Sequence, residues 1–429
     1  MQSLFQAPER VILHSDMNCF YASVECLHRP SIRNKAVVVG GDEEARHGIV
    51  LAKNQIAKAF GVKTGEALWE ARQKCPDLVV VPPNYSLYLK FSKLAREIYY
   101  EYTDLVEPFG LDEAWLDVSD SCHLWGSDIE LLVDEISSRI KFELGITVSI
   151  GVSWNKIFAK FGSDYKKPDG IIFISRNNYQ DIVWSAPVED LLYVGHATKR
   201  KLNDFGIFTI GDLAISDDRA IHMRLGKVGD ILLSFARGED SSEVRSFNPN
   251  LADIMHEIKS VGNGLTAPQD LITKQDCKAL IYLLSESVAQ RLREYKFLAN
   301  TIGIHVRDNK LCSYSAQAPL SHPSNITSEI ASAAFHLLAE HEPFDGSRIL
   351  RSLHVRASNL SLADKFVQYD IFGVSEKRGK LKQLDGAIDA LRQRFGNGII
   401  KRGAEITNSS MADLDIKRDN IIHPVGFFS

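Results

Sequence analysis

The stretch that decides the fold is Phe109 to Asp117, which reads FGLDEAWLD. It places two adjacent carboxylates, Asp112 and Glu113, between two apolar runs and directly after a turn that contains Gly110. Adjacent carboxylates repel each other, and their burial without a cation is costly. Because most such pairs decorate a solvated turn, a functional interpretation requires a third carboxylate at the same place.

The segments on either side of this turn predict a β-α-β-β-α-β order, the split βαβ arrangement of a ferredoxin-like α+β domain. Apolar periodicity places its strands and helices, in chain order, at 10–16, 86–102, 104–109, 113–118, 127–144 and 146–152. Ser127 and Glu130 form a predicted capping box at the start of the second helix. An insert of short helices and strands, 17–84, separates the first strand from the first of these helices.

This order brings a third carboxylate to the acidic pair. A right-handed crossover makes the first two strands parallel, and the hairpin makes the third antiparallel to both. If the third strand neighbours the first, Asp112 and Glu113 at its beginning lie beside Asp16 at the end of the first. The three carboxylates are therefore predicted to converge.

A divalent cation would turn the repulsion among these carboxylates into coordination. Mg²⁺ takes few protein carboxylates and completes its shell with water and substrate phosphates. Two such ions, roughly 4 Å apart, can clamp the attacking and leaving oxygens of a phosphoryl transfer. The residues thus predict nucleotidyl transfer, and they favour it over calcium storage because the alternating acids of an EF-hand loop are absent.

Composition sets the broad class. The 429 residues are 45% hydrophobic and 24% charged, which is ordinary for a globular protein of about three domains. The start has neither the basic nor the apolar region of a signal peptide, no long apolar window predicts a membrane helix, and the six cysteines form no Cys-x-x-Cys pair. We therefore expect a cytoplasmic protein with reduced thiols and no membrane partner. The net charge of −5 means that nucleic-acid binding would depend on local sites.

Four motifs, in order, carry a resemblance to a known family. They are SDMNCFYASVE at 15–25, GLDEAWLD at 110–117, GVSWNKIFAK at 151–160 and KKPDGI at 166–171. Together they strongly resemble the Y-family translesion DNA polymerases, and the bacterial DNA polymerase IV branch in particular. The resemblance extends over most of the chain to about residue 360.

The resemblance implies an error-prone, template-directed DNA polymerase that extends a primer 3′-hydroxyl with dNTPs in DNA damage tolerance and repair. It implies two Mg²⁺ ions, replaceable by Mn²⁺, held by Asp16, Asp112, Glu113 and the Met17 carbonyl. Asn18 stands where many relatives carry a second aspartate, at a position that is not among the essential ligands.

The resemblance also implies the nucleotide pocket. Phe20 and Tyr21 fall in it, and Tyr21 matches the steric gate, a ring that leaves no room for a 2′-hydroxyl. At the triphosphate, Gln55 and Lys58 stand where relatives often have Tyr and Arg, and Ala52 offers no polar side chain. Lys58 supplies a point charge without the bidentate fork of arginine. Lys167 matches the palm lysine that reaches the incoming phosphates.

The implied architecture is a right-hand polymerase. Its domains are a palm at 1–19 and 85–174, fingers at 20–84, a helix-hairpin-helix thumb at 175–240, a linker at 241–251, an α/β little finger at 252–360 and a tail at 361–429. In the little finger we expect strands at 257–261, 300–307, 312–317 and 350–357, and helices at 276–294 and 326–341. Candidates for DNA backbone contacts there are Lys259, Arg307, Lys310, Arg348, Arg351 and Arg356.

The tail is polar and charged, and we expect much of it to be loosely ordered, apart from a helix that residues 380–395 can form. It contains Gln368 to Phe372, QYDIF, which resembles the peptide by which bacterial polymerases dock on the sliding clamp. Ile371 and Phe372 would fill an apolar pocket while Gln368 fixes the orientation. The expected partners are primer-template DNA, dNTPs and this clamp, and the expected state is a monomer.

Two alternatives remain open. A catalytically silent relative would serve as a DNA- and clamp-binding scaffold, which the retained Asp16, Asp112 and Glu113 argue against. A different palm enzyme, such as a nucleotide cyclase, would have no use for a thumb, a little finger or a clamp peptide.

Overall fold

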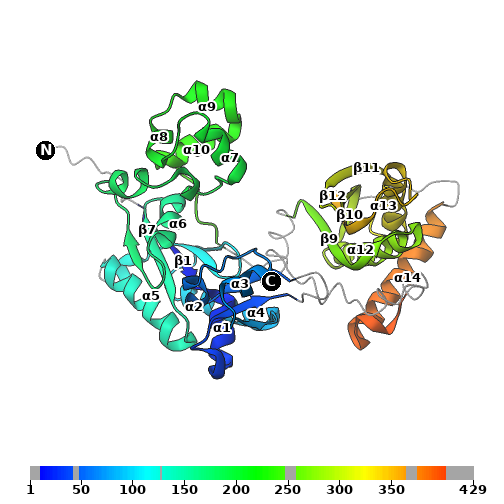
Figure 1. The fold of residues 1–429 in the computed structure, drawn as a ribbon, viewed down its shortest axis with the longest axis horizontal. Coiled ribbons are helices and arrows are strands. Elements are labelled where there is room, and N and C mark those ends of the chain that lie inside the picture. The colour runs from blue at the N-terminus through cyan, green and yellow to red at the C-terminus, as the bar shows by residue number, and fades with distance from the viewer. Residues whose placement is uncertain (1–9, 42–47, 126–127, 247–257, 364–373, 402–429) are drawn as a thin grey trace. The chain divides into compact units, whose positions relative to one another are not determined.

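The computed structural model describes residues 10–41, 48–125, 128–246, 258–363 and 374–401 (Figure 1). The chain divides into two compact units. The first comprises Met1–Gly41 and Ile49–Asn248, and the second consists mainly of Pro249–Ser429. Both contain sheets and helices, so the α+β class is confirmed.

The first unit is built on a five-stranded sheet in the order β5-β6-β1-β7-β8. Its strands are β5 (Val106–Pro108), β6 (Glu113–Asp117), β1 (Ile12–Met17), β7 (Val148–Ser153) and β8 (Ile171–Phe173). β1 is antiparallel to both β6 and β7, and β6 is antiparallel to β5. The predicted neighbours are therefore correct, and β8 adds a parallel edge strand that the sequence pattern did not indicate.

Helices cover both faces of this sheet. Ser15 of β1 meets Tyr99 of α4 (Tyr85–Tyr100), which packs beside α5 (Ile129–Leu144). On the other face, His14 meets Ser163 of α6 (Lys156–Tyr165). The cap of α5 differs from the prediction: Asp128, not Ser127, accepts the hydrogen bond of the Leu131 amide. Ser127 itself lies outside the described residues.

The insert after β1 forms a small separate core. It contains α1 (Phe20–His28), η1 (Pro30–Ile32), α2 (Gln55–Ala59), α3 (Leu68–Lys74) and a sheet in the order β3-β2-β4, with β2 at Val37–Gly40, β3 at Val50–Lys53 and β4 at Val79–Val81. Its buried side chains include Val38, Val50 and Leu68. This core positions the start of α2 beside the start of α1, as a contact between Gln55 and Cys19 shows.

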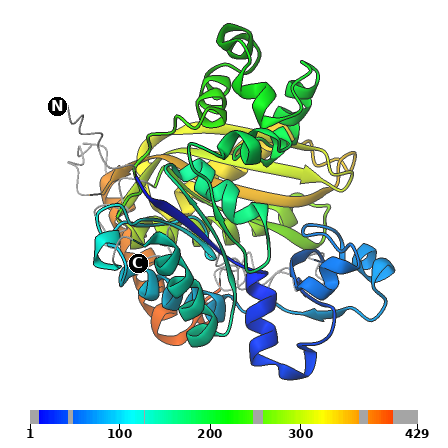
Figure 2. The same ribbon diagram turned by 90° about the vertical axis from the view of Figure 1, so that its left-hand side faces the viewer.

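The remaining part of the first unit is helical and is drawn in green in Figure 2. It contains α7 (His196–Asn203), α8 (Ile210–Ala214), α9 (Asp218–Leu225) and α10 (Lys227–Ala236), preceded by the short helices η3 (Gln180–Trp184) and η4 (Val188–Asp190). A further short helix, η2 (Cys122–Trp125), precedes α5. Gly195 is the N-cap residue of α7 and carries no side-chain cap.

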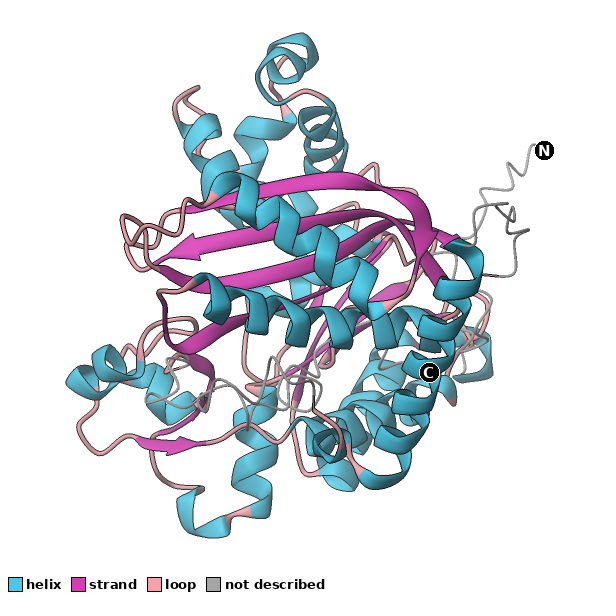
Figure 3. Cartoon of the chain, turned by 90° about the vertical axis from the view of Figure 1, so that its right-hand side faces the viewer, coloured by secondary structure: helices cyan, strands magenta, loops and turns pink. Residues whose placement is uncertain are grey.

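The second unit has a four-stranded antiparallel sheet in the order β11-β10-β12-β9, whose long strands are drawn in magenta in Figure 3. The elements are β9 (Ser260–Leu271), α12 (Lys274–Glu294), β10 (Phe297–Asp308), β11 (Ser313–Ser324), α13 (Thr327–His341) and β12 (Leu350–Leu362). The two helices and one face of the sheet enclose a large apolar core. The first strand of this unit was predicted to end at residue 261. β9 instead continues through Gly262 and Gly264 to Leu271.

The tail contains more structure than expected. α14 (Val374–Phe395) is followed by the short helix η5 (Asn397–Ile399), and α14 is bound to the second unit mainly by charged side chains. Arg293 of α12 pairs with Asp389 at 2.6 Å, Arg392 pairs with Glu286 at 2.8 Å, and Asp385 accepts the amide of Thr327 at 2.8 Å. Arg378 pairs with Glu329 of α13 at 2.9 Å. Residues 374–400 thus belong to this unit; α14 contains the helix expected over 380–395, but its start at Val374 and its attachment to α12 and α13 were not predicted.

Candidate active site

The three predicted carboxylates meet where β1 ends and β6 begins. Asp16 lies directly opposite Glu113 in the antiparallel register, so their side chains project from the same face of the sheet. The amide of Met17 donates to the carbonyl of Asp112 at 2.9 Å, which fixes the turn against the end of β1. The convergence predicted from strand topology is therefore present in the structure.

Two of these carboxylates are held in surroundings that disfavour their charge. Burial, together with repulsion from Glu113, raises the pKa of Asp16 to about 6. Burial, together with repulsion from Asp16 and Glu113, raises the pKa of Asp112 to about 7. Buried carboxylates that repel one another gain most from an added cation.

Two lysines approach the acids from one side. The Nζ of Lys160 lies 2.8 Å from Glu113 and 3.5 Å from Asp16, and the Nζ of Lys167 lies 2.6 Å from Asp16. Both lysines also contact Asp164. Burial opposes the charge of Lys160, but the carboxylates of Glu113 and Asp164 outweigh it and raise the pKa of this lysine. Lys167 was predicted to reach this site, whereas Lys160 was not assigned a role.

Lys160 reaches the acids because α6 lies unusually close to the sheet. Gly151 of β7 is the contact point: a Cβ at this position would lie 2.0 Å from the carbonyl oxygen of Ala159 and 2.5 Å from the amide of Ser163. Asn155 caps the start of α6 by accepting the Phe158 amide at 2.8 Å. The absence of a side chain at position 151 therefore sets the distance between helix and sheet.

His14 lies buried between this helix and the acids. Its Nδ1 is 2.8 Å from the Ser163 hydroxyl, and its Nε2 is 3.3 Å from a carboxylate oxygen of Glu113. The ring meets Trp115 edge-on, with 5.1 Å between centroids. Burial and the charge of Lys160 lower the pKa of His14 well below its usual value, so the imidazole is neutral. Sequence reasoning missed His14, although the alternation of side chains along a strand places it on the same face of the sheet as Asp16.

Beside the acids, α1 presents the predicted aromatic pair. The ring of Tyr21 stacks on Tyr88 with 4.2 Å between centroids and 11° between planes. Tyr88 is fully buried and donates to Glu25 at 2.7 Å, so the surface under Tyr21 is rigid. Burial, with the nearby charge of Asp112, raises the pKa of Tyr21 to about 12. Phe20 is 3% exposed and belongs to the core, so its own contribution to a pocket would come from its backbone.

Beyond Asp16, basic side chains surround the start of α1. Cys19 is the N-cap residue of α1, with a left-handed backbone (φ 50°) and no side-chain cap, and its thiol accepts from Gln55 at 3.4 Å. Burial raises the pKa of this thiol, and the positive charges that act on it in the opposite direction are those of Lys58, Lys53 and Lys167. The predicted Gln55 therefore contacts the start of α1, and the charges of the predicted Lys58 and Lys167 act on the same thiol, as does that of Lys53, which the sequence analysis did not single out.

The donor set fits a divalent cation chemically, because it offers hard carboxylate oxygens whose repulsion a cation would relieve. In the part of the chain that the structure describes, however, no three or more His, Cys, Asp or Glu side chains are already arranged around one point to hold an ion. The ammonium groups of Lys160 and Lys167 contact Asp16 and Glu113 there instead.

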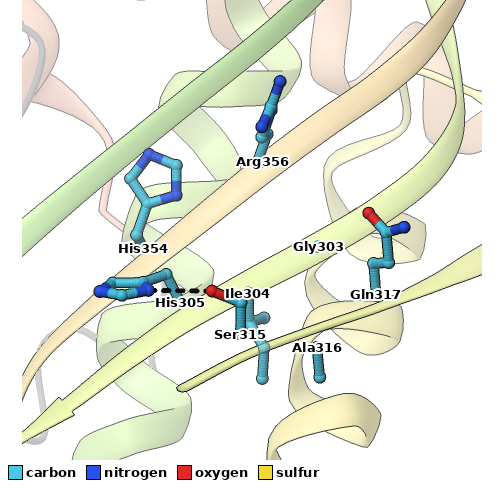
Figure 4. A pocket seen from close by; sticks show the side chains of 8 residues that line it. All are labelled: Gly303, Ile304, His305, Ser315, Ala316, Gln317, His354 and Arg356. Atoms are coloured by element: carbon cyan, nitrogen blue, oxygen red, sulfur yellow. Dashed lines mark hydrogen bonds between the residues drawn. The ribbon is translucent and has the colours of Figure 1, made fainter. Parts of the chain in front are cut away.

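The outer face of the second unit's sheet carries a polar pocket (Figure 4). Its lining comes from β10, β11 and β12 and consists of Gly303, Ile304, His305, Ser315, Ala316, Gln317, His354 and Arg356. His305 contacts Ser315 at 3.0 Å, and His354 lies opposite His305 on the neighbouring strand. None of these lining residues is acidic, so the pocket is suited to an anionic ligand.

The predicted DNA contacts of this unit differ in their surroundings. Arg356 of β12 is exposed in the pocket, and Arg307 of β10 is exposed on the same face of the sheet. Arg348, in contrast, pairs with Asp308 and Glu342 at 3.2 Å each and lies over the Tyr314 ring, which gives it a structural role. Lys259 and Lys310 are exposed, and Arg351 is half-buried. Gln368, Ile371 and Phe372 lie outside the described residues.

Comparisons with known proteins agree with this fold. Two models of the impB/mucB/samB family match, one at residues 15–164 and its C-terminal domain at 258–371. A DNA polymerase IV of Acetivibrio thermocellus is 50% identical over 92% of this chain and 97% of its own length, and one of Moorella thermoacetica is 36% identical over 93% and 97%. A solved Y-family DNA polymerase chimera, Dbh-Dpo4(243-245)-Dbh, superposes with a TM-score of 0.70 at 25% identity, covering 82% of this chain and 99% of its own.

The chain therefore belongs to the Y family of translesion DNA polymerases, which the motif resemblance predicted. Within that family it groups with the DNA polymerase IV relatives, and its enzyme class is DNA-directed DNA polymerase. Among the described residues, no helix is both long and apolar enough to cross a membrane.

Proposed function

We propose that this chain copies damaged DNA by nucleotidyl transfer at the meeting point of β1 and β6, with two Mg²⁺ ions held by Asp16, Asp112, Glu113 and the Met17 carbonyl. The observation that carries the proposal is the placement of Asp16 directly opposite Glu113, with the Asp112 backbone bonded to Met17. When bound, Mg²⁺ or a substituting Mn²⁺ would lower the pKa of the primer 3′-hydroxyl and neutralise charge on the triphosphate.

The two lysines have different roles in this proposal. Lys160 is 11% exposed at its side chain and contacts Glu113, Asp164 and Asp16, so it holds the acids in position. Lys167 is 27% exposed and can exchange its contact with Asp16 for a phosphate oxygen. His14 is fixed by Ser163 and packs beside Glu113, with 3.3 Å between its Nε2 and a carboxylate oxygen.

Tyr21 selects deoxyribonucleotides in this proposal. Its ring is backed by Tyr88, which Glu25 fixes, so it cannot retreat to admit a 2′-hydroxyl. Gln55, at the start of α2, and Lys58, in its last turn, would meet the triphosphate that enters beside α1.

DNA contacts are assigned to two places. The start of α7, at Gly195 and His196, offers uncapped amides to the duplex backbone, and the acid-free face of β10, β11 and β12 offers Arg307 and Arg356.

We keep the domain boundaries predicted from the sequence, except that residues 374–400 join the little finger. Docking on the sliding clamp through Gln368, Ile371 and Phe372, action as a monomer in the cytoplasm, and a role in DNA repair remain parts of the proposal.

Primer extension tests the metal site. The double variant Asp112→Asn/Glu113→Gln keeps the shape of both side chains, and we expect it to lose synthesis by about 10³-fold or more because the ligand charge is gone. DNA affinity and thermal stability should remain, since neither residue lies in the proposed DNA contacts. A matched control is Asp120→Asn/Glu130→Gln, which removes two carboxylates outside this site.

Either of two results would contradict the proposal. Full synthesis by the double variant would exclude Asp112 and Glu113 as ligands. Synthesis by neither wild type nor variant, with DNA binding intact, would establish the silent scaffold.

A further inference from the structure

The pocket on the outer face of the second unit's sheet has glycines on both sides of β12. Gly303 of β10 lies opposite Arg356 on one side. On the other side, Gly264 of β9 lies opposite His354, and Gly262 comes two residues earlier. A Cβ at Gly262 would lie 2.7 Å from Cε1 of His354, and a Cβ at Gly264 would lie 2.7 Å from its Cδ2. The two glycines of β9 therefore leave the space that the imidazole of His354 occupies.

Two imidazoles and a guanidinium line this pocket together (Figure 4). His305 lies directly opposite His354 in the antiparallel register, and Arg356 follows two residues later on the same face of β12. The Nδ1 of His305 lies 3.0 Å from the Ser315 hydroxyl, which orients that ring. None of the residues that line the pocket is acidic. Because directly opposite side chains on neighbouring strands are in reach of each other, one anionic group can meet all three basic side chains.

The surroundings of His354 disfavour its charged form in the protein alone. His305 faces it from β10, Arg356 from β12, and Arg291 from α12, where the guanidinium of Arg291 donates to the Gly262 carbonyl at 2.9 Å. The segments of β9 and β11 beside it carry no titratable side chain on this face. Burial, together with these three neighbours, lowers the pKa of His354. A bound anion would reverse this balance, because it favours the imidazolium.

We infer that His305, His354 and Arg356 form a site for one phosphodiester group of the DNA backbone, and that His354 takes up a proton from solvent when DNA binds. The new N–H bond turns a neutral ring into a charged donor to a phosphate oxygen. Gly303, which lies between Gln317 and Arg356, leaves the middle of the pocket open to that phosphate. The inference rests on the proposed function, because it takes primer-template DNA as the anion, and it adds proton uptake to the contacts proposed there.

Proton uptake makes the DNA affinity depend on pH in a defined direction. The phosphate raises the pKa of His354 in the complex above its lowered value in the free protein, so the complex holds more protons. The affinity should therefore rise as the pH falls between these two pKa values. For one proton, we expect about tenfold tighter binding at about pH 6 than at about pH 8.

Titration of labelled primer-template at several pH values and constant ionic strength, without dNTP, tests the inference. His354→Gln keeps a polar side chain of similar size, and we expect it to lose most of the pH dependence. His305→Gln should keep the dependence and move it to higher pH, because one charge that opposes protonation of His354 is gone. The matched control is His336→Gln: His336 is 77% exposed on α13, which covers the other face of the sheet, and its loss should change nothing.

The measured quantity is the difference between each variant and the wild type, because Asp16 and Asp112 titrate in the same pH range. Melting temperatures establish that the variants are folded. If glutamine at position 354 lowers the melting temperature, His354→Asn replaces it, since the shorter side chain enters the same space.

Three results would overturn the inference. The full pH dependence of the wild type in the folded position-354 variant would exclude proton uptake at His354. An equal loss of affinity at every pH in that variant would make His354 a neutral contact. Loss of the dependence in His305→Gln alone would assign the proton to His305. A wild type that binds primer-template at no pH would instead contradict the DNA contacts of the proposed function.

Discussion

The two large sheets of this polymerase arrange their polar side chains in opposite ways. In the first unit, charged groups converge on one point: Asp16 and Glu113 lie opposite each other, and Lys160 and Lys167 contact them. In the second unit, His305 of β10 and His354 and Arg356 of β12 lie among small polar residues, without an acid in the pocket lining. Chemistry needs convergence, because reacting atoms must be held at one place, whereas binding a long polyanion needs area.

The sheets also differ in how closely they are packed. The Cβ that alanine would add at Gly151 meets backbone atoms of α6 at 2.0 and 2.5 Å, whereas at Gly303, on the open face of β10, it would find only ordinary contacts at 3.5 Å and beyond. The site that performs chemistry thus depends on a close backbone approach, and the binding face does not.

The largest expected effect tests this difference in packing. Gly151→Ala should lower the free energy of unfolding by about 3 kcal/mol or more, because backbone atoms of α6 must move to admit the methyl group. Gly303→Ala should change it by less than about 0.5 kcal/mol. Thermal and urea unfolding of the two variants measure both values. Equal losses of unfolding free energy in the two variants would show that the first sheet tolerates a methyl group at position 151 as well as the second sheet does at position 303.

The next effect concerns substrate choice, which we assign to the first unit alone. Tyr21→Ala should reduce discrimination against ribonucleotides on the order of 100-fold, because the ring that occupies the place of the 2′-hydroxyl is removed. The measurement is the ratio of kcat/KM for dCTP and CTP. Arg356→Ala should leave that ratio unchanged, and an unaltered ratio in the Tyr21 variant would exclude the steric gate.

The smallest effect belongs to the second unit. Arg356→Ala should weaken DNA binding about fivefold and reduce the salt dependence by about one counterion, while the KM for dNTP stays constant. Titration of labelled primer-template at several salt concentrations measures this, with Lys93→Ala, an exposed change on α4, as the control. An unchanged salt slope would show that Arg356 contacts no phosphate.

Topology alone predicted the meeting of Asp16 with Asp112 and Glu113, because crossover handedness and hairpin geometry leave few arrangements of β1 and β6. The roles of Lys160 and His14 could not be predicted, since both depend on how closely α6 approaches the sheet. Helical periodicity gives the face on which a lysine lies, but not the distance from that face to an acid on another strand.

The attachment of α14 to the second unit was not predicted, for a related reason. Its sequence is highly charged, and charged segments usually remain solvated. Here the complementary charges are Arg293, Glu286 and Glu329, which come from two earlier helices. Such long-range pairing leaves no local signal in the pattern of residues.

The attachment of α14 has a practical consequence for where this polymerase can be shortened. A truncation directly after the clamp-like peptide, Gln368 to Phe372, would remove a charged tail whose sequence suggests that it is dispensable. It would also leave Arg293 and Glu286, both largely buried, without the partners that neutralise them, and it would take away the carboxylate that accepts the first amide of α13. Loss of one member of a buried ion pair is strongly destabilising. Truncations intended to isolate the second unit should therefore retain α14.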